Sequence, residues 1–221
     1  MIGVIIITYF IADIVARTST EEKLSLIYEG EKKEIEEKNL NFTSAFLDSL
    51  LALDLANDFK LKADVKYQIS KFFYESALNV DSSSDLENFK EIIIDNCTDA
   101  MQEYYYSSLN FNNSIIIFTV TKNYTAYDIY HNLLDLYINL SKSGYKLSLI
   151  KYNASKYLID IAENLTLKGK KIDISMDLGN LMDLFNSTEY LMELENELYE
   201  GIRILISEYD LIEIRKDYWN N

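Results

Sequence analysis

The sequence contains no proline, one cysteine, one histidine and only six glycines among its 221 residues. Without proline, helices can continue uninterrupted, and proline-rich linkers are excluded. The single cysteine, Cys97, excludes an intramolecular disulfide framework and any metal site built from several cysteines. The single histidine, His131, excludes the paired-histidine motifs of zinc proteases. Stability must therefore come from packing or from self-association.

Motifs for nucleotide binding and catalysis are also missing from the sequence. The glycines do not have the spacing of a phosphate-binding loop or a Rossmann turn, and no GxSxG elbow occurs. Cys97 lies on the apolar stripe of a predicted helix, which indicates a buried, inert thiol. His131 lies at the edge of another helix face, which is typical of a hydrogen-bonded, partly exposed imidazole. Glu31, Glu34 and Glu37 share a helix face and could hold a divalent cation loosely.

These absences lead us to predict no catalytic residue, no cofactor and no specific metal site. We therefore predict that the protein is not an enzyme, and the alternative is a hydrolase whose catalytic residues form no recognisable motif. With 36 acidic against 21 basic residues, the net charge is −15. Nucleic-acid binding depends on clustered Lys and Arg, so we predict no nucleic-acid partner. The hydrophobic content of 48% is enough for a folded core.

The most informative pattern is an excess of the N-glycosylation acceptor motif Asn-x-Ser/Thr. A random arrangement of this composition would give roughly 2.5 such triplets. The chain has eight, at Asn41, Asn96, Asn112, Asn123, Asn139, Asn153, Asn164 and Asn186. Most of them fall where turns are expected, whereas Asn96 falls within a helical pattern and is the weakest candidate. The sequence therefore predicts an exported, glycosylated chain at the cell surface or outside the cell.

The N-terminal segment from Ile2 to Ala16 is mostly apolar. As a helix it would span about 22 Å, which is short of the roughly 30 Å hydrocarbon layer of a membrane. We interpret it as an anchor or assembly helix, with a secretory signal or a buried core element as alternatives. Self-association, or contact with other surface proteins, would then use this helix, and membrane contact is a further option. Its candidate residues are Val4, Ile5, Ile6, Phe10, Asp13 and Ile14.

Helical patterns dominate the next part of the chain. A capping box at residues 18–22 predicts a new charged helix that runs as a stalk to about Lys38. Residues 42–58 and 65–78 predict two further helices, and a second capping box at Ser84 and Glu87 opens another. An amphipathic helix is predicted over residues 125–140. We therefore divide the chain into an N-terminal helix with its stalk, residues 1–38, and a globular head, residues 39–221.

The later part of the chain shows the alternation of apolar residues that is typical of strands. Residues 114–121, SIIIFTVT, predict one strand, and alternating residues at 145–149, 157–161 and 172–178 predict three more. Lys168-Gly169-Lys170 is a predicted hairpin tip. A short helix ending at Gly201 and a hairpin around Tyr209-Asp210, joining 202–206 to 211–214, complete the pattern. Helices followed by a mostly antiparallel sheet predict an α+β fold.

An apolar N-terminal helix, a charged helical extension and a glycosylated head resemble the layout of archaeal type IV pilin-like subunits. The resemblance rests on residues 1–40 and on the general architecture. It implies that apolar helices pack in a filament core while the heads face outward. We therefore expect a structural subunit of a surface filament or assembly. The alternative is a single-span, membrane-anchored surface protein that binds a ligand or partner.

Overall fold

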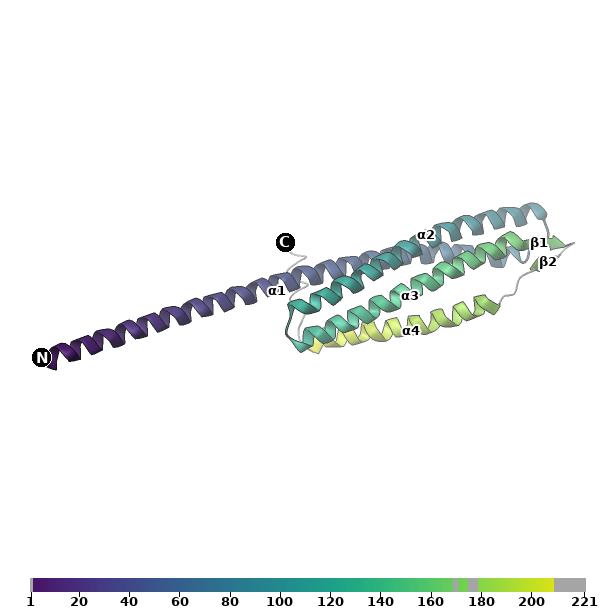
Figure 1. The fold of residues 1–221 in the computed structure, drawn as a ribbon. Helices are drawn as coiled ribbons and strands as arrows, with labels where there is room; N and C mark the ends of the chain where they lie inside the picture. Colours follow the sequence, from purple (N-terminus) through teal and green to yellow (C-terminus); the bar gives the residue numbers. More distant parts are fainter. Residues whose placement is uncertain (1, 169–170, 175–178, 209–221) are drawn as a thin grey trace.

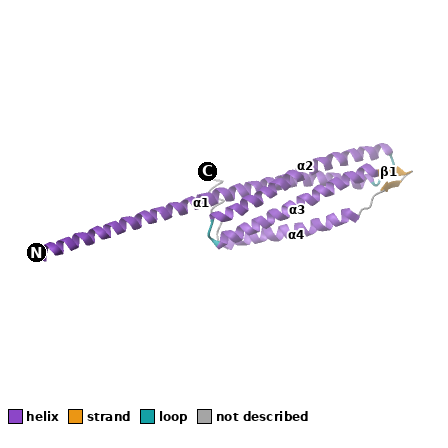
Figure 2. Cartoon of the chain, viewed as in Figure 1, coloured by secondary structure: helices purple, strands orange, loops and turns teal. Residues whose placement is uncertain are grey.

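Figure 1 shows the fold of the computed structural model, which describes the backbone of residues 2–168, 171–174 and 179–208. Side chains are described for residues 23–168, 172–173 and 187–208. Helices make up most of this described part, and the strands form one short hairpin (Figure 2). The elements in chain order are α1 (Ile2–Ala77), α2 (Ser83–Thr121), the 3-10 helix η1 (Lys122–Tyr124), α3 (Asp128–Asn164), β1 (Leu165–Lys168), β2 (Lys171–Ile174) and α4 (Gly179–Glu208).

The second half of α1 packs with α2, α3 and α4 into an elongated bundle, and the first half of α1 projects beyond it (Figure 1). Neighbours in the chain are neighbours in space, because α1 packs along α2, α2 along α3 and α3 along α4. The hairpin of β1 and β2 lies at the far end of the bundle from the N-terminus (Figure 1). With 76 residues, α1 alone is about 110 Å long.

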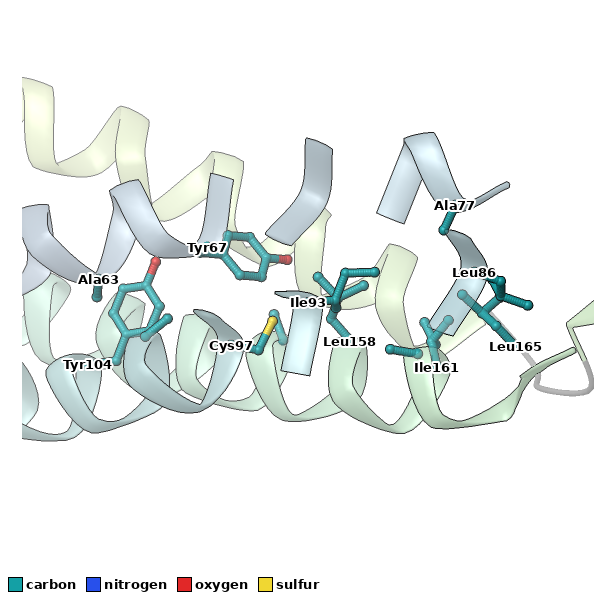
Figure 3. Close-up of a cluster of buried hydrophobic side chains, with 13 residues drawn as sticks. Ala63, Tyr67, Ala77, Leu86, Ile93, Cys97, Tyr104, Leu158, Ile161 and Leu165 are labelled. Carbon is teal, nitrogen blue, oxygen red and sulfur yellow. The ribbon is translucent and has the colours of Figure 1, made fainter. Parts of the chain in front are cut away.

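Two clusters of buried side chains form the core. The cluster nearer the hairpin includes Tyr67 from α1, Cys97 from α2 and Leu158 from α3, and Figure 3 shows these residues together. The other cluster lies nearer the projecting end of the bundle and includes Phe46 and Phe118. Alanine, serine and glycine occupy many of the remaining contact positions, which lets the helix backbones approach closely.

The predicted α+β fold is wrong, because the described chain is almost entirely helical and has only the two short strands. Residues 114–121, predicted as a strand, lie inside α2. The buried positions there are Phe111, Ser114, Phe118 and Thr121, which recur every three or four residues as a helix requires. Two of these four positions are small polar residues, so a pattern that counts only large apolar side chains does not register the helical period.

The same reason accounts for the strands predicted at 145–149 and 157–161, which both lie inside α3. Serine and alanine again complete the buried face of that helix, at Ser148, Ala154, Ser155 and Ala162. In the part of the chain that the structure describes, the sheet is one strand pair across the predicted tip Lys168-Gly169-Lys170, with Lys168 opposite Lys171. Residues 169–170 and 175–178 lie outside the described part of the chain.

Several predicted helix boundaries are also wrong. The capping box at 18–22 does not open a helix, because α1 continues through it, and the helices predicted at 42–58 and 65–78 are parts of the same α1. Helix α2 begins at Ser83 with Ser82 at the cap, rather than at Ser84. Helix α4 continues through Gly201 to Glu208, so residues 202–206 are helical. Residues 209–214, the rest of the last predicted hairpin, lie outside the described part.

The separate apolar helix predicted at the N-terminus is instead the beginning of α1. Its candidate anchor residues Val4, Ile5, Ile6, Phe10, Asp13 and Ile14 have helical backbone, and their side chains lie outside the described part. Among the side chains described from residue 23 onward, no helix is long and apolar enough to cross a membrane.

Candidate functional site

The eight predicted glycosylation sites lie mainly on the outer surface of the bundle. Six of the asparagines are exposed: Asn41, Asn112, Asn123, Asn139, Asn153 and Asn164. Asn96 is half-buried and its amide donates a hydrogen bond to the carbonyl of Ile92, 2.9 Å away. The side chain of Asn186 lies outside the described part. Asn96 lies inside helix α2, as predicted. The prediction that most of the other sites lie in turns is wrong, because Asn41, Asn112, Asn139, Asn153 and Asn164 lie in helices, and Asn123 lies in η1.

In three of these motifs, however, the serine is buried. Ser114, Ser141 and Ser155 are fully buried, and Ser114 Oγ lies 2.8 Å from Ser141 Oγ across the α2–α3 contact. Residues two apart in a helix point about 200° apart, so an exposed asparagine at i places the residue at i+2 on the packed face. Helix packing therefore accounts for the serine in the motifs of Asn112, Asn139 and Asn153. The acceptor motif needs the hydroxyl as well as the amide, and these three hydroxyls are enclosed.

Three other motifs have an exposed asparagine and a hydroxyl residue that is not fully buried. Asn41, Asn123 and Asn164 are exposed, and the hydroxyl residues Thr43 and Thr125 are half-buried while Thr166 is exposed. Helix packing does not account for the hydroxyl residue in these three motifs. No feature of the sequence separates them from the other five, because the distinction depends on which face of the bundle each residue occupies.

The projecting part of α1 forms a second candidate site, which we call the α1 extension (residues 23–41). Its charged residues form ion pairs along the helix, such as Lys38 with Glu34 at 2.8 Å, and this contact lowers the pKa of Glu34. Its large apolar side chains are exposed to solvent at 57–70%. They are Leu24, Leu26, Ile27, Tyr28, Ile35 and Leu40.

Part of this exposed apolar surface continues the buried face of α1. Beginning inside the bundle, a series with a spacing of seven residues is buried at each position: Phe42, Ser49, Ala56, Ala63, Ser70 and Ala77. The same spacing extended backward reaches Ile35 and Tyr28, which are 57% and 68% exposed. We call Leu24, Tyr28 and Ile35 the α1 seam. A repeat of seven keeps one face toward a partner helix over many turns. Inside the bundle, a partner helix packs on this face of α1. Along the α1 seam, none of the described residues of this chain does so.

A third feature is a groove of about 550 Å³ at the end of the bundle where α1 leaves it. It lies between α1 and α4 and reaches α3, since α4 packs mainly on α3 and leaves α1 uncovered there. Its aromatic wall includes the rings of Phe42 and Phe46, 5.8 Å apart, and that of Tyr130, 4.9 Å from Phe42. The groove is lined by Phe42, Phe46, Leu50, Leu53, Tyr130, Leu133, Tyr137, Tyr199, Ile202 and Ile206, with Asp54, Asn57 and Arg203 among its polar residues.

Polar contacts close the groove where α1 and α4 approach each other. Lys60 Nζ of α1 lies 3.0 and 2.8 Å from the carboxylate oxygens of Glu195 in α4, and both side chains are nearly buried. One turn away, the amide of Asn57 lies 3.5 Å from the hydroxyl of Tyr199. Burial raises the pKa of Tyr199, and the negative charge of Glu195 adds to the shift. The hydroxyl therefore stays protonated and acts as a hydrogen-bonding group.

The residues singled out for chemistry in the sequence occupy structural positions. Cys97 is fully buried and burial raises its pKa to about 11. The His131 ring is half-buried, with Nε2 3.0 Å from the carbonyl of Thr125. Both observations confirm the environments predicted for these side chains. Among the described residues, no cluster that could hold a metal ion is present, including at Glu31, Glu34 and Glu37.

One buried polar cluster was not predicted. The hydroxyl of the buried Tyr104 donates to Asp64 Oδ1 at 2.5 Å, and Lys151 Nζ lies 2.7 Å from the same oxygen. Burial and the neighbouring Asp64 charge raise the pKa of Tyr104. The cluster joins α1, α2 and α3 at one carboxylate oxygen, so it restrains the register of these helices against one another.

Comparison with protein-family models, with characterised proteins and with solved structures finds no match for this chain.

Proposed function

We propose that this chain is an exported structural subunit that self-associates through the α1 extension, as in a surface filament or a pilin-like assembly. The observation that carries the proposal is the α1 seam, an exposed continuation of a buried helix face. The helical bundle is the head of the subunit, and its net negative charge keeps it solvated.

The physical argument concerns the stability of a helix that stands alone. Most helix stability in proteins comes from packing of an apolar face, and isolated helices are marginal in water. The α1 extension has i,i+4 ion pairs, which contribute only weakly in solvent. A partner on the seam would add the missing packing energy. Self-association would therefore stabilise a part of the described chain that the bundle leaves unsupported.

Glycosylation supports the location of this subunit. Asn41, Asn123 and Asn164 combine an exposed amide with an accessible hydroxyl residue, and they lie at different places on the head and its junction with the extension. Glycans are bulky and solubilising, so sites on the head are compatible with assembly through the extension. We propose these three as the modified residues.

The proposal is tested by measuring the size of the full chain in solution as its concentration rises. Tyr28→Glu combined with Ile35→Glu places charges in the seam and should abolish assembly. Both residues are exposed in the single chain, so helix content measured by circular dichroism should not change. Leu26→Glu is the matched control, because Leu26 is equally exposed but lies on another side of the helix. If the wild-type chain stays monomeric at every concentration, the proposed function is wrong.

The groove favours a second candidate function, the binding of an apolar or amphiphilic ligand. Its volume and aromatic walls are typical of small-molecule sites. A fluorescent fatty acid is a suitable probe. Leu50→Arg, which charges the wall of the groove, should abolish its binding, whereas Leu109→Arg on the exposed surface of α2 should not. Equal binding by both variants would show that the probe does not use the groove.

A further inference from the structure

We propose that the groove between α1 and α4 binds a single-chain amphiphile with an ammonium head group, and that Asp54 receives the ammonium. This inference rests on the second candidate function, ligand binding in the groove, and names the class of ligand. Two observations carry it. The lining is apolar at one end of the groove and polar at the other, and the Asp54 carboxylate has no cationic partner among the described residues.

The lining of the groove changes in character along α1. Where α1 leaves the bundle, the α1 wall consists of large apolar side chains, such as Phe42, Leu47 and Leu50. Further into the bundle, the same wall includes Asp54 and Asn57. The helix rises by about 22 Å between Phe42 and Asn57. A long alkyl chain with one polar end matches this division.

The polar end of the groove offers hydrogen-bond acceptors. The Asn57 amide donates to the Tyr199 hydroxyl at 3.5 Å, which leaves the amide oxygen as an acceptor. Asp54 lies three residues before Asn57, on the same side of the helix. Burial and the charge of Glu195 raise the pKa of Tyr199, and the charge of Asp54 adds to this shift, so the carboxylate lies near that hydroxyl. An ammonium group has three donors and no acceptor, which suits these oxygens.

The balance of charges around the groove favours a cation. Arg203 of α4 also lines the groove, but its guanidinium lies 2.9 and 2.5 Å from the carboxylate oxygens of Glu200 in the same helix. Lys60 is paired in the same way with Glu195. Asp54 is exposed and forms no ion pair with the described residues. Within the described lining, its negative charge is therefore the unbalanced one.

The two ends of the groove contribute differently to binding. At the apolar end, the rings of Phe42, Phe46 and Tyr130 form a wall for the alkyl chain, and each buried methylene raises the affinity about fourfold. At the polar end, water screens the contact with the exposed Asp54, so the ammonium raises the affinity only about three- to tenfold. The alkyl chain thus supplies most of the affinity, and Asp54 selects the head group.

The test compares three ligands that share a dodecyl chain and differ in head group: dodecylammonium, dodecanol and dodecanoate. Titration calorimetry of the full chain, below the concentrations at which the ligands form micelles, measures each affinity. Dodecylammonium should bind about three- to tenfold more tightly than dodecanol. Dodecanoate should bind more weakly than dodecanol, because its carboxylate is repelled by Asp54.

Substitutions of Asp54 test its role in the contact. Asp54→Asn should remove the advantage of dodecylammonium over dodecanol, and Asp54→Lys should make dodecanoate the tightest of the three ligands. The position is exposed, so helix content measured by circular dichroism should not change. Asp48→Asn is the matched control, because it removes the same charge from an exposed position of α1 that does not line the groove. It should leave the preference for dodecylammonium unchanged.

The outcomes distinguish this inference from the second candidate function. If Leu50→Arg abolishes the binding of all three ligands but the wild type binds them equally, the groove is a binding site and the assigned head group is wrong. A preference for dodecylammonium that survives in Asp54→Asn would also overturn the inference. So would tighter binding of dodecanoate that is lost in Arg203→Gln. If the wild type binds none of the three ligands, the inference and the second candidate function are both wrong.

Discussion

Gly144 of α3 lies against the ring of Phe111 in α2, and the contact leaves no room for a side chain. A Cβ atom at this position would lie 2.4, 2.5 and 2.8 Å from three atoms of the Phe111 ring. The ring is almost fully buried, so it cannot move away into solvent. Glycine is unfavourable inside a helix, and its presence here is explained by this close approach.

Gly144→Ala should therefore destabilise the bundle by about 1–3 kcal/mol, the usual cost of overpacking a core. The measurement is the free energy of unfolding in urea. Gly201→Ala is the control, because its Cβ would lie 3.6 Å from Leu136, an ordinary contact. That variant should be neutral or more stable by up to about 1 kcal/mol, since alanine favours helix. Equal destabilisation by both variants would contradict the close-contact explanation.

The buried thiol and tyrosines predict a loss of stability at alkaline pH. Burial raises the pKa of Cys97 to about 11 and also raises the pKa of Tyr67. In the unfolded chain these groups ionise near their ordinary values of about 8.5 and 10. Above pH of about 9 the unfolded state thus binds fewer protons than the folded state, so the free energy of unfolding falls as pH rises.

Cys97→Ala should make this decline shallower, by up to about 2 kcal/mol between pH 8 and pH 11. The measurement is the urea midpoint as a function of pH for the variant and the wild type. The comparison concerns the slopes, because the substitution also changes stability at neutral pH. Identical slopes would show that Cys97 is not protected from ionisation.

At this scale the sequence predicts the surroundings of Cys97 and His131 better than those of the buried serines. The burial of Cys97 and the hydrogen bond of His131 were predictable, since each lies at a defined place on a helical apolar stripe. The buried serines were not, because serine is common on surfaces and its burial here depends on the neighbouring helix. Ser107 illustrates this, as its hydroxyl lies 2.9 Å from both the Ala56 carbonyl of α1 and Ser148 Oγ of α3.

Among the elements, α4 and α1 share two polar contacts, Lys60 with Glu195 and Asn57 with Tyr199. The Lys60–Glu195 pair is 14% and 11% exposed, and Lys60 Nζ also lies 5.9 Å from the centre of the Phe111 ring. The other packing of α4 is with α3. A buried ion pair contributes little net stability, but losing one partner leaves an uncompensated buried charge.

Lys60→Met should therefore destabilise the chain by about 2–4 kcal/mol, because Glu195 is left buried without its partner. Lys60→Met combined with Glu195→Leu should recover most of this loss, since no charge remains buried. Urea unfolding of the wild type, both single variants and the double variant measures the coupling. Additive effects would show that the two side chains do not interact. The exposed pair Lys62–Asp58 is the control, and Lys62→Met should have little effect.

The differences between the predicted and the observed helices and strands have a physical explanation. The apolar stripe of α2 from Leu86 to Tyr104 was recognisable, because it is built from large residues with helical spacing. The strand predicted at 114–121 followed the β-branched residues of that stretch, whose intrinsic preference is overridden by packing. Ile116 and Val120, which suggested a strand, are exposed at 54% and 44% on the outside of α2.

The shape of the whole molecule follows from the seven-residue series of α1. Within the bundle the series is satisfied by α2, and beyond Phe42 the same face is exposed. The length of α1 was not predictable, because a capping box at 18–22 and the charged residues up to Lys38 both suggested separate elements. A capping box is a local signal, and here it lies in the interior of the continuous helix α1.

The state of the eight acceptor motifs should report whether the chain is modified before or after its bundle forms. If the transferring enzyme meets the folded chain, peptide mass spectrometry of the native protein should find glycans at Asn41, Asn123 and Asn164. Asn112, Asn139 and Asn153 should be bare, because the hydroxyls of Ser114, Ser141 and Ser155 are enclosed. Thr166→Val removes one motif at an exposed position of β1 and should lower the intact mass by a single glycan, without changing stability. Glycans on all six exposed asparagines would instead show that modification precedes folding, and a chain with no glycan at any site would remove the support for export.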